Sequence, residues 1–319
     1  DKRRFKARLV ADGNRELSTD SWQRSQGGDY WSPVSSLANV RSITAYAAMH
    51  GYDLMTADVE AAYLQGEILG DPVYVVFPKE VNPSGRPCRL LKPLYGLQRA
   101  GFCWHTHFDD RIHDIGWQSS NEIKAVYTKE VEGYTIVLII YVDDIMLCGP
   151  PAIAKKELML IGDQVQLSCV KSLHDDGPLH FLGLYLTPDG PHTIYVSQTQ
   201  YVERIVSKFE DHYDLKLRTT KGVTPYADPT PQVQVEEEPQ GSQERDCRMW
   251  VGSIMYPARG SRPDLITPII RLARQVAAWS SESQARMQNL FQYLKGHPDK
   301  VLGMIFVGDP DEEFTLEIY

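Results

Sequence analysis

The sequence predicts a fold of mixed helices and strands around a central sheet, of the α/β or the α+β class. Two observations lead to this prediction. Up to about residue 191, segments with apolar residues at helical spacing alternate with short apolar segments bounded by Gly and Pro. From residue 198 onward the pattern becomes mostly helical. Such alternation is typical of a sheet that is covered by helices.

The first predicted elements each end at a turn signal. A short strand in "KARLVADG" stops at Asp12-Gly13, and a helix over Val34–Gly51 stops at its glycine. "YDLMTADVEAAYLQG" predicts a strand that turns into a short helix, and "PVYVVFP" predicts a strand between prolines. "GLQRAGFCWHTHFDDRIHDIGW" carries a long amphipathic helix that stops at Gly116. In these segments, predicted strands alternate with predicted helices that would cover the sheet.

The next elements complete the sheet and begin the helical part. "AVYTKEVEGYTIVLIIYVDDIMLCGP" predicts three strands, with a turn at Glu132-Gly133, and "AIAKKELMLIGDQV" predicts a helix. "GPLHFLGLYLTPDGPHTIYVS" predicts a hairpin that turns at residues 188–190. Three later segments predict amphipathic helices: "QTQYVERIVSKFEDH", "LITPIIRLARQVAAW" and "SQARMQNLFQYLKGH". A Pro, Gln and Glu-rich linker precedes the last two helices.

Composition sets the broad class of the protein. The 319 residues are 42% hydrophobic, which suffices for a sizeable core and predicts two or three domains. We expect a soluble chain without membrane contact, because no apolar run approaches the length of a span. The five cysteines show no metal-binding spacing, which predicts neither a disulfide framework nor a zinc site. The formal net charge of −9 argues mildly against nucleic-acid binding, which needs clustered Lys and Arg, although the distribution of charge matters more than its total.

One stretch carries chemistry. In "LIIYVDDIML", Asp143 and Asp144 stand between two runs that are apolar enough to be buried strands. Buried like charges repel and lose hydration, so such a pair either faces water at a turn or is neutralised by a cation. Asp58 ends the apolar stretch "LMTAD", and all three acids meet if its strand pairs beside the 143–144 hairpin. Three carboxylates at one sheet end suit two divalent cations and in-line phosphoryl displacement.

Several motifs, taken in order, resemble one family. They are "KARLVADG", "SPVSSLANVRSI", "DVEAAYLQGEI", "VYVVFP", "CRLLKPLYGLQRAGFCW", "IIYVDDIML", "HFLGLYL", "SQTQYVERIVSKF", "VGSIMY", "SRPDL" and "FQYLKGHPD". The ordered set resembles the reverse transcriptase region of the Pol polyprotein of copia-type long-terminal-repeat retrotransposons. The resemblance implies a mixed α+β chain with a right-handed polymerase fold: a ferredoxin-like palm, partial fingers and a helical thumb.

The same resemblance implies a division of the chain and a cellular setting. Residues 1–191 would form the partial fingers and the palm, and residues 192–297 a helical thumb with a disordered linker near 228–245. Residues 298–319 would be a tether towards an RNase H domain that lies outside this sequence. The family is expected in cytoplasmic virus-like particles, with the nucleus as the alternative. The residues leave the oligomeric state open.

The resemblance also implies roles for the site residues, which we take as expectations. The metal ligands would be Asp58, Asp143, Asp144 and the carbonyl of Val59, and the first three would also be catalytic. The residues that contact the incoming deoxynucleotide (dNTP) would be Lys6, Arg8, Tyr63 and Gly96. Primer and template would be contacted by Tyr141, Phe181, Leu182 and Gly183. The cofactor would be two Mg²⁺ ions, with Mn²⁺ as a substitute, and the partners an RNA or DNA template with its primer.

Two other classes of function stay open at this point. "YGLQRAGFCW" departs from the family pattern "YGLKQAPRxW", which is compatible with an inactive relic that retains the fold. The acids alone are also compatible with a metal-dependent phosphohydrolase or cyclase on a similar sheet. That second alternative leaves the "LYGLQ" and "FLG" matches unexplained.

Overall fold

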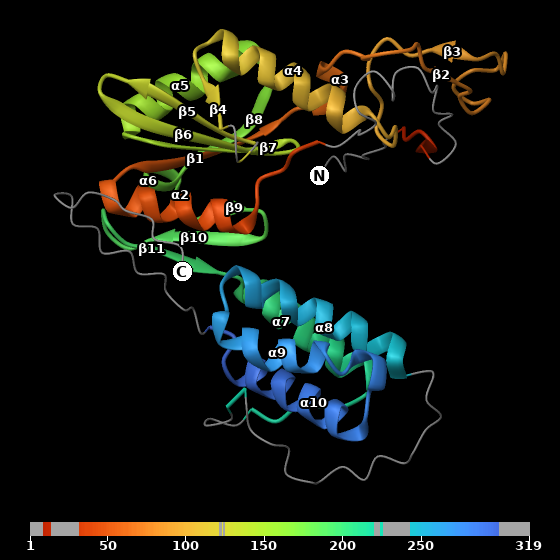
Figure 1. The fold of residues 1–319 in the computed structure, drawn as a ribbon, viewed down its shortest axis with the longest axis vertical. Coiled ribbons are helices and arrows are strands. Elements are labelled where there is room, and N and C mark those ends of the chain that lie inside the picture. Colours follow the sequence, from red (N-terminus) through yellow and green to blue (C-terminus); the bar gives the residue numbers. More distant parts are fainter. Residues whose placement is uncertain are drawn as a thin grey trace, which may run out of the picture. The chain divides into compact units, whose positions relative to one another are not determined.

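The computed structural model describes residues 9–13, 32–120, 123, 125–219, 224–225 and 243–299 (Figure 1). The chain divides into two compact units, Asp1–Asp176 and Gly177–Tyr319. We describe each unit by itself. In the described residues no helix is long and apolar enough to cross a lipid bilayer.

The first unit is built on a six-stranded antiparallel sheet. Its strands stand in the order β4-β5-β6-β7-β1-β8, and a separate two-stranded sheet joins β2 to β3. The helices are α2 (Leu37–His50), α3 (Ala62–Gln65), α4 (Ala100–Asp114), α5 (Pro151–Gln164) and α6 (Leu173–Asp176). The strands are β1 (Asp53–Val59), β2 (Tyr74–Val75), β3 (Cys88–Arg89), β4 (Gln118–Ser119), β5 (Val126–Val131), β6 (Tyr134–Tyr141), β7 (Asp144–Gly149) and β8 (Leu167–Ser172).

Helices cover both faces of the sheet, with α4 and α5 on one face and α2 on the other (Figure 1). The buried core under α4 and α5 contains Trp104, Phe108 and Ile161 packed against the apolar residues of β6 and β7. β7 is buried from Ile145 to Gly149, because it lies in the interior of the sheet with both faces covered. The predicted apolar runs around the two acids are therefore confirmed as central strands.

The local signals of the sequence explain several element boundaries. Ser36 caps α2 by accepting a hydrogen bond from the Asn39 backbone N–H, and Gly51 ends the helix in the left-handed conformation with φ 63°. The β5–β6 hairpin turns through Glu132 and Gly133, both at positive φ, as a type I′ turn requires. The predicted strand in "KARLVADG" differs: its residues 9–13 form no strand.

The second unit combines a three-stranded sheet with a helical bundle. Its strands are β9 (Leu179–Phe181), β10 (Leu184–Pro188) and β11 (Ile194–Ser197), and its α-helices are α7 (Thr199–His212), α8 (Gln243–Gly260), α9 (Ile266–Ala273) and α10 (Ser281–Gly296). Two short 3₁₀ helices, η2 (Pro263–Leu265) and η3 (Val276–Ala278), flank α9. Phe209 of α7 stacks on Phe291 of α10 with ring centroids 3.9 Å apart, at the centre of the bundle core.

The division of the chain differs in place from the predicted one. We expected a change near residue 191, whereas the compact units divide between Asp176 and Gly177. Within the second unit, the Tyr256 hydroxyl of α8 donates to the Leu182 carbonyl of the β9–β10 turn, at 2.8 Å. Helix α8 begins at Gln243, inside the predicted linker near 228–245. The described residues leave out the remainder of that linker and residues 300–319.

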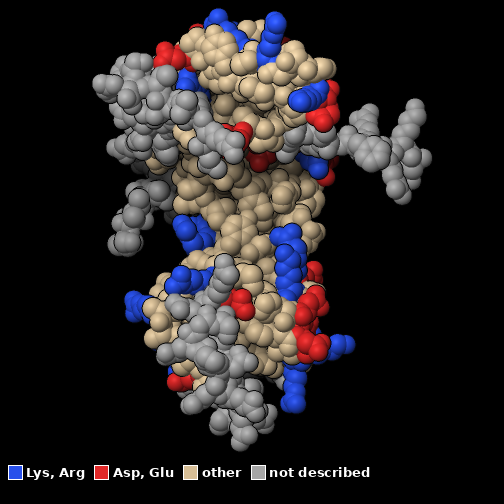
Figure 2. Space-filling view, turned by 90° about the vertical axis from the view of Figure 1, so that its right-hand side faces the viewer, with Lys and Arg blue, Asp and Glu red and all other residues tan. Residues whose placement is uncertain are grey.

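Charges are dispersed over the surface. Figure 2 shows Lys and Arg side chains standing singly or in small groups among uncharged residues, without a continuous basic stripe over the described part of that face.

Candidate active site

Two of the predicted catalytic acids face each other on neighbouring strands. β1 pairs antiparallel with β7, and this register places Asp58 opposite Asp144. The pairing is consistent with the sequence, since the residues before Asp58 in β1 and those after Asp144 in β7 are buried. The structure thus confirms the predicted pairing of the Asp58 strand beside the 143–144 hairpin.

The third acid lies in the tight turn between β6 and β7. Tyr141 pairs with Asp144, which leaves Val142 and Asp143 as a two-residue loop. Val142 has φ 60° and Asp143 does not have positive φ, which is the pattern of a type II′ turn. Glycine is the usual residue at that first position, and a β-branched side chain there is strained by about 1–3 kcal/mol.

Two hydrogen bonds hold this strained turn. The Val59 backbone N–H donates to the Asp143 carbonyl at 2.7 Å. The Trp104 indole N–H of α4 donates to the Val142 carbonyl at 2.6 Å, and its ring is 1% exposed. Sequence analysis missed Trp104, because "FCW" on an amphipathic helix indicates an ordinary core residue. Trp104 holds the Val142-Asp143 turn in position.

The three acids form a group of like charges. Burial, the charges of Asp143 and Asp58, and a hydrogen bond with Asp58 together raise the pKa of Asp144 to about 6. The charged neighbours that cause this shift are both carboxylates. At neutral pH the deprotonated group is therefore an unfavourable concentration of negative charge, which a bound cation would relieve.

The three carboxylates suit a hard divalent cation, although their side chains are not arranged around a common metal position. Within the described residues, no group of three or more His, Cys, Asp or Glu side chains is placed to hold a metal ion. Asp58 and Asp144 interact directly, and Asp143 is coupled to Asp144 through its charge. Carboxylate oxygens are the ligands that suit Mg²⁺.

The predicted nucleotide-binding residues are only partly brought to this site. Tyr63 of α3 is half-buried and packs on Tyr95 with ring centroids 4.8 Å apart. Burial raises the pKa of Tyr63, and the charge of Asp143 adds to the shift, which places the phenol near the catalytic turn. Lys6 and Arg8 lie outside the described residues.

Position 96 requires glycine because neighbouring residues of the same chain lie too close for a side chain. It has φ +91°, and a Cβ there would collide with the Ala11 carbonyl oxygen and with Val10. The Ala11 backbone N–H donates to the Tyr95 carbonyl at 2.7 Å, which fixes the two segments together. Gly96 is thus approached by the Ala11 backbone and the Val10 side chain, and its predicted contact with the nucleotide stays a prediction.

The predicted primer-contacting residues differ in accessibility. Tyr141 ends β6 next to the acids and is 38% exposed. In the second unit, Leu182 and Gly183 form the β9–β10 turn with φ 47° and 74°. Phe181 is 3% exposed, so its ring belongs to the core and the hairpin presents its turn and not this side chain. Whether the hairpin binds a primer remains a prediction.

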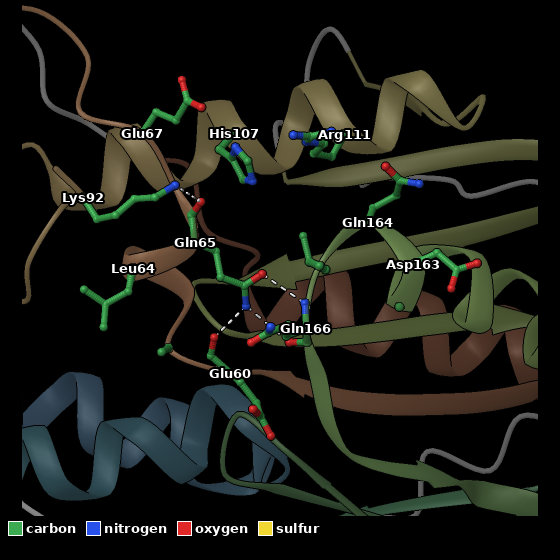
Figure 3. A pocket seen from close by; sticks show the side chains of 13 residues that line it. Glu60, Leu64, Gln65, Glu67, Lys92, His107, Arg111, Asp163, Gln164 and Gln166 are labelled. Atoms are coloured by element: carbon green, nitrogen blue, oxygen red, sulfur yellow. Dashed lines mark hydrogen bonds between the residues drawn. The ribbon is translucent and has the colours of Figure 1, made fainter.

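A separate polar cleft lies on the other side of α3. Figure 3 shows this space of about 480 Å³ between α3, α4 and the loop after α5, with His107 and Arg111 of α4 on one wall. The Gln65 side chain donates to the Glu60 carbonyl at 2.6 Å and accepts from the Gln166 backbone N–H at 3.0 Å. None of the three predicted catalytic acids lines the cleft.

Comparison with known proteins decides the family. The family model for reverse transcriptase (RNA-dependent DNA polymerase) matches residues 1–219. The chain belongs to this reverse transcriptase family. Its curated relatives include copia-type retrovirus-related Pol polyproteins.

Three of these relatives come from plants. The chain is 27% identical over 305 residues to the Pol polyprotein from transposon RE1 of Arabidopsis thaliana, covering 93% of this chain and 19% of the relative. It is 27% identical over 303 residues to that from transposon RE2 of the same plant, with the same coverage. It is 28% identical over 314 residues to that from transposon TNT 1-94 of Nicotiana tabacum, covering 92% and 22%. The reverse transcriptase chain thus spans about a fifth of these polyproteins.

Solved structures give a weaker likeness. The foamy viral protease-reverse transcriptase in complex with double-stranded DNA matches with a TM-score of 0.41 and 12% identity, over 79% of this chain and 37% of that one. The family assignment follows from the sequence comparisons alone.

Proposed function

We propose that this chain is the RNA-directed DNA polymerase segment of a copia-type Pol polyprotein and transfers a nucleotide from a dNTP to the 3′-hydroxyl of a primer. The observation that carries the proposal is the register of β1 and β7, which puts Asp58 opposite Asp144 at the mouth of the YVDD turn. Residues 1–191 would act as partial fingers and palm, and 192–297 as the thumb. The template would be RNA or DNA.

Two divalent cations would be held by Asp58, Asp143 and Asp144, with the Val59 carbonyl as a further ligand. Mg²⁺ is the expected ion and Mn²⁺ a substitute. When bound, such ions lower the pKa of the attacking hydroxyl and support the leaving pyrophosphate. The protein's own task is to keep the acids in place, which the bonds from Val59 N–H and from Trp104 to the turn accomplish.

The remaining residues of the site would position the substrates. Tyr63, held on Tyr95, would lie under the incoming sugar and exclude a ribose 2′-hydroxyl. Lys6 and Arg8 would balance the charge of the triphosphate. Tyr141 and the Leu182-Gly183 turn would contact the primer strand.

The proposal is tested by primer extension on a poly(rA)/oligo(dT) duplex with dTTP and Mg²⁺. We expect extension by the parent chain and none by the Asp143→Asn/Asp144→Asn double variant, with circular dichroism showing that both are folded. Extension by both chains, or by neither although the parent is folded, would contradict the proposal. The second result would favour the inactive relic.

A template-free reaction separates the remaining alternative. A phosphohydrolase or cyclase would turn over dTTP without template or primer, whereas a polymerase releases pyrophosphate only as the primer grows. We expect pyrophosphate release to require the duplex. Template-independent turnover that is lost in the Asp143→Asn/Asp144→Asn variant would assign the same carboxylates to the other chemistry.

Tyr63 should determine the choice of sugar. Replacing Tyr63 by valine removes the ring that would collide with a 2′-hydroxyl, so we expect the preference for dTTP over UTP to fall by about 10-fold or more, which is about 1.4 kcal/mol of discrimination. The measurement is the ratio of kcat/KM for the two nucleotides on the same duplex. Tyr63→Phe retains the ring and serves as the control, with a ratio close to that of the parent. An unchanged ratio in Tyr63→Val would remove Tyr63 from this role.

A further inference from the structure

The Gln65 side chain joins two segments of the first unit that lie far apart in the sequence. Its Nε2 donates to the Glu60 carbonyl, just after β1, at 2.6 Å, and its Oε1 accepts from the Gln166 backbone N–H, just before β8, at 3.0 Å (Figure 3). The same Nε2 lies 3.4 Å from the Gln166 carbonyl oxygen. The amide therefore contacts both polar groups of the Gln166 backbone, as a neighbouring strand would.

Helix α3 depends on contacts of this kind. It has only four residues, Ala62–Gln65, and so short a helix is not stable by itself. The residue before it, Ala61, has φ 49° and ψ 46°, a left-handed conformation that is strained for a residue with a side chain. Ala61 also provides no side-chain hydrogen bond to cap the helix. Contacts with the rest of the first unit must therefore hold α3 in place.

Tyr63 and Gln65 lie on opposite sides of this helix. Residues two positions apart in a helix are separated by about 200° around its axis. Tyr63 packs on Tyr95 with ring centroids 4.8 Å apart, whereas Gln65 lines the polar cleft, which Tyr63 does not line. The hydrogen bonds of the Gln65 amide thus hold α3 from the side away from the Tyr63 ring.

We propose that Gln65 is a positioning residue for sugar selection, which holds α3 so that the Tyr63 ring stays where it excludes a ribose 2′-hydroxyl. The inference rests on the proposed function, in which Tyr63 lies under the incoming sugar. Exclusion by a steric clash works only if the ring cannot move away, so a helix that is free to shift would tolerate the 2′-hydroxyl. Gln65 acts through Tyr63 and does not touch the nucleotide.

A further bond reaches the backbone of the same residue. The Lys92 ammonium donates to the Gln65 carbonyl oxygen at 3.3 Å, at the C-terminal end of α3. This carbonyl is present whatever side chain stands at position 65. Substitutions at Gln65 therefore test the side-chain amide separately from the bond to Lys92.

The first test measures sugar selection. Gln65→Met keeps the length of the side chain and removes both hydrogen-bonding groups of the amide. We expect the ratio of kcat/KM for dTTP to that for UTP on poly(rA)/oligo(dT) to fall about 3- to 10-fold, the range expected for the loss of one or two hydrogen bonds. An unchanged ratio in Gln65→Met would overturn the inference.

The matched control is Gln164→Met. Gln164 ends α5 and lines the same cleft, but its side chain forms no hydrogen bond with any residue that the structure describes. The same substitution there removes an amide from the cleft and leaves the connection between α3 and β8 intact. The ratio should therefore stay within about twofold of the parent value. Circular dichroism and thermal melting check that both variants are folded.

A double-mutant cycle separates positioning from a general loss of structure. If Gln65 acts through the Tyr63 ring, Gln65→Met should lower the ratio in the parent but not in the Tyr63→Val background, where the ring is already absent. Equal reductions in the two backgrounds would mean that Gln65 affects the sugar preference by another route, and would overturn the inference.

Hydrogen exchange tests the holding of α3 without catalysis. The Leu64 N–H donates to the Ala61 carbonyl at 2.7 Å, so its exchange reports opening of the helix. We expect residues 58–68 to exchange at least about 3-fold faster in Gln65→Met than in the parent or in Gln164→Met. Unchanged exchange would overturn the inference.

The two measurements together distinguish this failure from a failure of the proposed function. Faster exchange in Gln65→Met, with primer extension and an unchanged sugar ratio, would refute the positioning role and leave the polymerase standing. Faster exchange without any extension by the folded parent would refute the polymerase, and the role in sugar selection with it.

Discussion

Replacing Asp58 by asparagine should lower primer extension by at least about 10³-fold while making the folded protein more stable at pH 7.5. The loss follows because an amide is a poor ligand for the cations that the three acids would hold. The gain follows because Asp58 and Asp144 lie opposite each other on β1 and β7 and repel when both are charged. An asparagine amide can instead donate to the Asp144 carboxylate.

The sign of the stability effect depends on pH. In the parent, burial and the two neighbouring acids raise the pKa of Asp144 to about 6, above that of the unfolded chain. A raised acid pKa means that the folded state binds the proton more tightly, so stability is lost as pH rises from about 4 to about 6. With Asp58 neutralised, the pKa of Asp144 should fall and less stability should be lost. We expect a gain of about 1 kcal/mol at pH 7.5, after allowance for solvent screening at this half-exposed site.

The check is thermal or urea unfolding of both chains at pH 7.5 and near pH 4, without divalent metal. The difference between them should be present at pH 7.5 and largely absent near pH 4, where Asp144 is protonated and no longer repels Asp58. Adding Mg²⁺ should stabilise the parent more than the variant, because only the parent keeps all three carboxylates. A variant that is less stable at both pH values would mean that Asp58 has a structural role and that the repulsion argument is wrong.

The sequence predicted the part of the site that depends on strand pairing. Two apolar runs flank Asp143 and Asp144, and a third ends at Asp58, so burial of the three strands brings the acids to one sheet end. Helix α2 was predictable from its periodicity and from Gly51. These features follow from local pattern and burial, which a single sequence contains.

Other features depend on contacts that the sequence does not encode locally. β8 has mostly exposed or intermediate residues without clear alternation, so its sequence "LSCVKS" does not indicate a strand. It becomes a strand by pairing with the edge of β1. Helix α8 contains Pro257, and proline normally breaks a helix. The helix continues through this proline while Trp250 and Ile254 pack in the bundle core. The bond from Trp104 to Val142 joins residues 38 positions apart.

The hydrogen bond from Trp104 to Val142 is the basis of a second prediction with a large expected effect. Replacing Trp104 by phenylalanine keeps a buried ring in α4 but removes the indole N–H that holds the Val142 carbonyl. Val142 has φ 60°, a conformation that a β-branched residue keeps only when its surroundings enforce it. We expect kcat for primer extension to fall about 10- to 100-fold, or about 1.4–2.7 kcal/mol, because the turn would then relax and displace Asp143.

Trp117 provides a matched control for this experiment. It is 1% exposed and packs in the same core, but its indole N–H has no hydrogen-bond partner among the described residues. Trp117→Phe should therefore cost a similar amount of packing without loosening the turn, and kcat should remain close to that of the parent. Thermal melting of both variants would show whether their packing losses are comparable.

The kinetic signature distinguishes positioning from general loss of structure. If Trp104 acts through the turn, Trp104→Phe should lower kcat while the KM for dTTP and the affinity for the duplex change little, because the binding surfaces are untouched. Equal losses in Trp104→Phe and Trp117→Phe would mean that core packing and not the hydrogen bond is responsible. A fall confined to Trp104→Phe would show that this indole acts by holding the Val142-Asp143 turn in position.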